Sequence, residues 1–190
     1  MHELTITLGP ERSNGILFFH AFTGCDIVSS FRGKGKKSAW QTWDVCPEAS
    51  DVFTKLSSYP THVEKEDIER LEKFVVRMYD RSSSTEAVDD ARLELFSRKQ
   101  RSYEAIPPTR SVLVQHIRRA AYQSACIRGA GLWSVRLKRR ILHNGAGNKK
   151  KTSGVSYGWS FHQLLRVVSN LLNASARPSV EDVASVTSLV

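Results

Sequence analysis

Residues 17–26 read LFFHAFTGCD and residues 31–39 read FRGKGKKSA. The first stretch is apolar and is predicted to be a helix that ends at Gly24, because glycine is the usual residue for the left-handed end of a helix. In the second, Gly33 and Gly35 precede a segment with helical spacing, so that backbone N–H groups at a helix start can approach a phosphate. The spacing is not the GxxxxGK[ST] of a Walker A loop, which argues against nucleotide hydrolysis. The two stretches therefore predict a helix, a glycine-rich loop and a second helix.

Outward from these stretches, the chain is predicted to be mainly helical. The clearest helical period lies in residues 64–79, where apolar side chains recur opposite a charged face. A helix over residues 109–126 follows Pro107 and Pro108, with Val112, Leu113, His116, Ile117, Ala120 and Ala121 as its apolar stripe. Further helices are expected over residues 11–22, 36–43 and 48–56, and from Ser84 or Thr85 through Phe96, and residues 4–8 form the one stretch with a strand-like pattern.

Composition divides the chain into four parts. Residues 1–128 form a helical region, and beyond them Gly, Ser, Lys and Arg predict a flexible basic connector over residues 129–159. An amphipathic helix follows over residues 160–173, and residues 174–190 form a tail. The apolar face of this last helix either packs on the same core or binds a protein partner or a second copy, through Phe161, Leu165, Val168 and Leu172.

The charge of the chain indicates a polyanionic partner. Its 190 residues suit one compact domain, and 28 basic against 19 acidic residues give a net charge of +9. Residues 110–151 contain eleven basic side chains and no acidic one. Such a segment attracts polyphosphates when it is folded, and is otherwise a solvated tail. We expect DNA, bound through its phosphate backbone and with no cofactor required, as the partner.

The cysteines and the N-terminus bear on the compartment. Cys25, Cys46 and Cys126 lie far apart and form neither a disulfide framework nor a zinc knuckle. The strongest apolar run, residues 16–22, is too short to span a bilayer, and no basic region followed by a long apolar stretch opens the chain. We expect an intracellular protein, nuclear or cytoplasmic, with no signal peptide and no membrane contact.

Several side chains allow more than one interpretation. Asp26 follows the glycine turn, where its carboxylate either reaches a divalent cation such as Mg²⁺ or caps the next turn. Phosphodiester hydrolysis with two metal ions needs several carboxylates, and the nearby ones are Glu3, Glu11 and Asp44. We therefore assign no catalytic residue. His20 and His116 are interpreted as core histidines, and Trp40 and Trp43 either belong to the core or stack on unpaired bases.

The order of Gly24-Cys25-Asp26 and Gly33-Lys34-Gly35 resembles the metal-dependent, structure-specific nucleases of the flap endonuclease and XPG type, which have a PIN-like domain. In that family a helix ending in Gly-Cys-Asp precedes a Gly-x-Gly hairpin that opens a helix, and this helix-hairpin-helix element grips duplex DNA. The sequence is also similar to uncharacterised animal proteins, often associated with mobile elements, with His-Ala-Leu-Thr-Gly-Cys-Asp, Gly-Lys-Gly-Lys and a Pro-Pro-Thr before Gln-His-Ile. The likeness covers about residues 10–126.

The resemblance implies a mainly α fold: the helical C-terminal portion of a PIN-like domain, with most of its α/β core lacking. It implies a metal-binding carboxylate at Asp26 and a DNA-backbone contact at residues 33–37. The family's other carboxylates lie on strands before the Gly-Cys-Asp segment, and this chain begins about 25 residues before Asp26. We therefore expect a nucleic-acid-binding remnant of a nuclease, without catalysis of its own. The alternatives are a diverged Mg²⁺-dependent nuclease completed by another chain, and a helical protein-interaction module. The residues expected to bind nucleic acid are Gly33, Lys34, Gly35, Lys36, Lys37, Arg118, Arg119, Arg136, Lys138, Arg139 and Arg140.

Overall fold

The computed structural model describes residues 2–97, 102, 105–143, 166 and 170. Within these residues the protein is built from six α-helices, and its only β-type pairs are two isolated bridges. The expected mainly α class is therefore confirmed. The helices are α1 (His2–Phe22), α2 (Lys36–Val45), α3 (Ala49–Ser58), α4 (Lys65–Tyr79), α5 (Val88–Ser97) and α6 (Arg110–His143).

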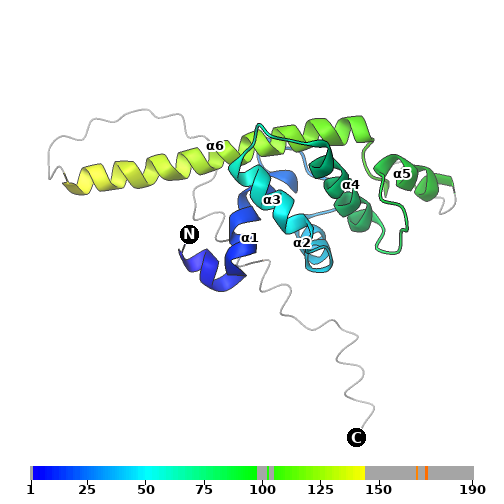
Figure 1. Ribbon diagram of the computed structural model, residues 1–190, viewed down its shortest axis with the longest axis horizontal. Helices are drawn as coiled ribbons and strands as arrows, with labels where there is room; N and C mark the ends of the chain where they lie inside the picture. The colour runs from blue at the N-terminus through cyan, green and yellow to red at the C-terminus, as the bar shows by residue number, and fades with distance from the viewer. Residues whose placement is uncertain (1, 98–101, 103–104, 144–165, 167–169, 171–190) are drawn as a thin grey trace, which may run out of the picture.

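Helix α1 is the centre of the packing. It contacts α3 and α6, while α4 contacts α2, α3, α5 and α6. Residues 16–22 of α1 are all buried, which explains why this segment is apolar on every side. Figure 1 shows α6 lying across the other helices, with its C-terminal half extending beyond them. No helix in the described part of the chain is both long and apolar enough to cross a bilayer.

Aromatic side chains fill the core. The ring of Phe53 on α3 lies 4.8 Å from Trp43, 5.3 Å from Phe74 and 6.0 Å from Phe19, measured between ring centroids. Trp40 and Trp43 are 2% and 0% exposed, so the interpretation of this pair as core residues is confirmed. Neither indole is available to stack on a base.

Two expected boundaries near the ends of helices were wrong. Residues 4–8 lie in α1 and not in a strand, because a lone alternating segment has no partner strand to pair with. A kink at Gly9, with φ 77° and ψ 164°, separates them from the rest of α1. Helix α5 begins at Val88 and not after Ser84 or Thr85, because the Thr85 hydroxyl is already hydrogen-bonded to Ser83 within the loop.

Helix α6 is longer than expected. It continues to His143, so the prediction of a flexible connector from Gly129 was wrong for residues 129–143. Arg, Lys and Leu are good helix formers, and here they outweigh the two glycines. Leu113 and Ile117 of its expected stripe are buried, whereas Val112 is 58% exposed. The predicted helix over residues 160–173 lies outside the described residues, apart from Arg166 and Asn170, as do residues 144–159 and 174–190.

Candidate nucleic-acid interface

The ammonium group of Lys36 closes the C-terminal end of α1. Its Nζ donates to the carbonyl oxygens of His20 and Gly24, at 2.9 and 2.5 Å, and to the hydroxyl of Thr23 at 2.9 Å. The end of a helix has unpaired carbonyls and a partial negative charge, so a cation there is stabilising. Burial lowers the pKa of Lys36 to about 8. We expected this amine at a phosphate, but its three N–H donors bind α1 instead.

A second side chain, from α6, forms a hydrogen bond with the same end of α1. Nε2 of His116 donates to the carbonyl oxygen of Phe22 at 2.8 Å, and its ring lies 5.3 Å from that of Phe22 and 4.9 Å from that of Phe31. Burial lowers the pKa of His116, so its imidazole is neutral at pH 7. His116 is half-buried and packs at the edge of the core. The motifs at residues 20–26, 33–36 and 115–117 therefore meet at the end of α1.

The glycine hairpin, residues 31–35, is held in place by a side chain of α4. Its turn closes through an N–H of Lys34 that donates to the carbonyl of Phe31 at 3.1 Å, with Gly33 at φ 69°. The hydroxyl of Tyr79, the last residue of α4, donates to the carbonyl of Arg32 at 3.1 Å. The Lys34 ammonium lies 5.4 Å from the centroid of the Tyr79 ring. Burial raises the pKa of Tyr79 to about 12, so this hydroxyl remains a donor at every physiological pH.

The first turn of α2 is open to an anion. Gly35 is the N-cap residue, and none of the described side chains caps the helix there. No acidic residue lies in its first turn, and Gly33, Gly35 and Lys37 are exposed. Unpaired N–H groups and the positive end of the helix dipole favour a phosphate at such a position.

Exposed cations lie on the hairpin, on α2 and on segments that contact them, and we call Arg32, Lys37, Arg81, Arg118 and Arg119 the hairpin cations. Arg119 follows His116, which contacts Phe31 of the hairpin, by three residues and so neighbours it on the surface of α6. Arg118 follows His116 by two residues and lies on another side of the same turn. Arg81 donates to Gln41 of α2 at 3.2 Å, one helical turn from Lys37. Sequence reasoning missed Arg81, because only the packing of α4 against α2 brings it there.

The remaining predicted cations lie away from the hairpin. Arg136, Lys138, Arg139 and Arg140 belong to the last turns of α6, and Arg136 lies about 25 Å beyond Arg119 along the helix axis. Figure 1 shows this end of α6 beyond the other helices. Along the axis of α6, Arg118 and Arg119 lie close to His116, which contacts the hairpin, whereas the C-terminal cluster lies several turns further on.

Asp26 lies at an exposed turn, closed by the N–H of Cys25, which donates to Val28 at 2.9 Å. Of the nearby carboxylates, Asp44 forms an ion pair with Arg12, 2.7 Å long, near the middle of α1. Among the described residues, no group of three or more His, Cys, Asp or Glu side chains is placed to hold a metal ion.

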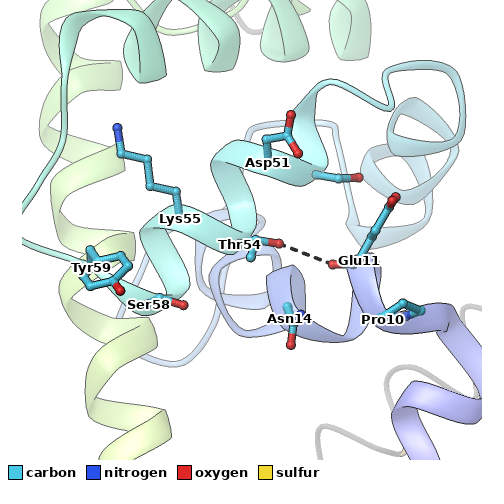
Figure 2. Close-up of a pocket in the computed structure, with 9 residues that line it drawn as sticks. Pro10, Glu11, Asn14, Asp51, Thr54, Lys55, Ser58 and Tyr59 are labelled. Carbon is cyan, nitrogen blue, oxygen red and sulfur yellow. Dashed lines mark hydrogen bonds between the residues drawn. The ribbon is translucent and has the colours of Figure 1, made fainter.

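A pocket of about 380 Å³ lies between α1 and α3 (Figure 2). Exposed carboxylates of Glu11 and Asp51 line it, and the Lys55 ammonium beside it is bound to Glu64 and Asp67. The hydroxyl of Thr54 donates across it to the carbonyl of Glu11 at 3.4 Å. This charge makes the pocket unsuitable for a polyanion, so the hairpin is the better candidate for the interface.

Comparison with protein-family models, with curated proteins and with solved structures finds no match for this chain.

Gly24 and Gly33, the two glycines with positive φ between α1 and α2, allow a matched test of this loop. We expect Gly24→Ala to lower the free energy of unfolding by about 2 kcal/mol, because φ is 104° and a Cβ would lie 2.6 Å from Cβ of Ser30. Gly33→Ala should cost about 1 kcal/mol, since φ is 69° but nothing lies within 4 Å of the new Cβ. Urea unfolding followed by circular dichroism measures both. Equal losses would contradict the close approach of Gly24 to Ser30.

Proposed function

We propose that this chain binds nucleic acid through the phosphate backbone, without sequence specificity and without catalysis of its own. On this view it is a nuclear or cytoplasmic remnant of a PIN-like nuclease, and the resemblance of its Gly-Cys-Asp and Gly-Lys-Gly-Lys motifs supports that origin. The observation that carries the proposal is the uncapped start of α2, which follows a hairpin bound by Tyr79, together with the exposed hairpin cations.

The contacts to Lys36 divide the basic motif into two roles. Lys36 binds the end of α1 and so holds the start of α2 in place, while Lys37 is exposed beside it. A phosphate at the first turn of α2 would receive hydrogen bonds from backbone N–H groups and charge from Lys37. Arg81, Arg118 and Arg119 would extend the contact to neighbouring phosphates. Such contacts read no base, which is why the proposed binding is not sequence-specific.

The proposal assigns no catalytic role to Asp26. Hydrolysis with two metal ions requires several carboxylates around one point. Glu11 lies about 17 Å before the end of α1 along the helix axis, whereas Asp26 follows that end. Asp44 is held by Arg12, close to Glu11 in the sequence. Binding to the phosphate backbone itself requires no metal ion.

Charge reversal at one exposed lysine tests the proposed interface. We expect Lys37→Glu to weaken binding to a fluorescein-labelled 20-base-pair duplex about tenfold at 50 mM salt, because it removes one phosphate contact and adds a repulsion. Fluorescence anisotropy measures the affinity, which should also fall steeply between 50 and 200 mM salt.

Lys65→Glu is the matched control. Lys65 is exposed in the first turn of α4, whereas the hairpin is bound by Tyr79 at the other end of that helix. The net charge changes equally in both variants, so we expect the control to bind within about twofold of the wild type. Equal losses in the two variants, or no binding by the wild-type chain at 50 mM salt, would refute the proposed interface.

A further inference from the structure

Tyr122 is an exposed aromatic side chain in a basic part of α6. Its side chain is 70% exposed, whereas the aromatic rings of α1 and α2 are buried in the core. Arg119 and Arg118 precede it by three and four residues, and side chains at these spacings are neighbours on a helix surface. Both arginines are exposed, and no described carboxylate pairs with either of them. The ring of Tyr122 thus lies one turn from two available guanidinium groups.

The face of α6 that carries Tyr122 does not contact the core. Leu113, Ile117 and Ala121 are buried on the side that packs against the other helices, whereas Gln115 and Cys126 are exposed with Tyr122. An exposed tyrosine by itself is common on protein surfaces. Here it lies within a run of residues, 110–151, that contains no acidic side chain at all.

A row of residues at i, i+3 spacing on α6 connects this face with the hairpin. His116 contacts Phe31 of the hairpin, with 4.9 Å between ring centroids. Arg119 follows His116 by about one turn, and Tyr122 follows Arg119 by about one more. A nucleic-acid backbone bound at the hairpin and followed along α6 would therefore reach the two arginines and then the tyrosine.

We propose that Tyr122 stacks on an unpaired base while Arg118 and Arg119 bind its flanking phosphates, so that the chain takes single-stranded nucleic acid. This inference rests on the proposed function, and it adds the class of substrate. Every base has a flat π-face, so stacking on an aromatic ring tolerates any sequence and suits backbone-directed binding. In a duplex the bases are stacked on each other, and the ring has no free face to meet.

The test uses labelled dT20, rU20 and the 20-base-pair duplex with the full chain, by fluorescence anisotropy. We expect Tyr122→Ala to weaken binding to single strands about tenfold and binding to the duplex less than twofold. Tyr122→Phe should restore single-strand affinity, because it retains the ring. Tyr59→Ala is the matched control, since Tyr59 is 63% exposed but follows α3, beside the acidic pocket. This control should bind all three probes like the wild type.

The outcomes separate this inference from the proposed function. If the wild type binds the probes and Lys37→Glu weakens that binding, but Tyr122→Ala binds single strands as tightly as the wild type, the stacking site is refuted and the proposed function stands. Equal losses on single strands and duplex, or no rescue by Tyr122→Phe, would also overturn it. If the wild type binds none of the probes, both proposals fail. A Tyr122 effect on only one of dT20 and rU20 supports the site and identifies the type of strand it takes.

Discussion

Replacing Lys36 with methionine is expected to lower the free energy of unfolding by about 3 kcal/mol. The change removes the donor to three acceptors, the carbonyl oxygens of His20 and Gly24 and the hydroxyl of Thr23. Burial of the ammonium has its own cost, which is seen in the lowering of its pKa to about 8. The loss of three hydrogen bonds at a buried helix end exceeds what methionine recovers. Urea unfolding at pH 7, followed by circular dichroism, measures the change.

Lys37→Met is the matched control, because it makes the same chemical change one residue further along α2. Lys37 is exposed and no hydrogen bond or ion pair of its side chain is seen in the described structure, so we expect a change below about 0.5 kcal/mol. Similar losses in the two variants would refute the helix-closing role of Lys36. The same contrast shows why Lys37, and not Lys36, is the residue to change in a binding assay: loss of affinity on changing Lys36 would report loss of structure.

The sequence allowed the helices to be predicted, but not the roles of the lysines in the glycine hairpin. Residues 33–37 read GKGKK, and composition treats the three lysines alike. A signal for Lys36 was present: it precedes Ala39, Trp40 and Trp43 by three, four and seven residues, which places it on the buried face of α2. The acceptors of its ammonium are carbonyl oxygens at the end of α1. This contact between two helices depends on the tertiary fold and has no signal in the local sequence.

Other parts of the candidate interface had no local signal. Arg81 reaches α2 only because α4 packs against it, and its neighbours in the sequence form a polar loop. Tyr122 was inside a predicted helix, but its exposure depends on which side of α6 faces the core. The continuation of α6 past Gly129 was missed because glycine-rich, basic composition predicts a linker, whereas each further helical residue adds a hydrogen bond to a helix that already exists.

Acidification from pH 6.5 to pH 4 is expected to lower the free energy of unfolding by about 3 kcal/mol through His20. Burial, and then the charge of Lys36, lowers the pKa of His20 from 6.5 to about 4 in the folded chain. Between these values the unfolded chain binds a proton that the folded chain does not, so stability falls as the pH falls. Above pH 6.5 His20 is neutral in both the folded and the unfolded chain, so its titration no longer lowers the free energy of unfolding. His116 acts in the same direction, because burial lowers its pKa too.

His20→Gln separates this effect from the titration of carboxylates in the same range. Glutamine does not titrate, so the variant should lose less stability than the wild type between pH 6.5 and pH 4, by up to about 3 kcal/mol. His62→Gln is the control, since His62 is exposed and its side chain meets water in both states. Urea unfolding at half-unit pH steps gives the slope for each protein. If the His20→Gln chain keeps the wild-type slope, His20 is not the group that titrates. If its slope flattens, the imidazole between Lys36 and the aromatic core is held neutral by burial, and the end of α1 that supports the glycine hairpin weakens in acid.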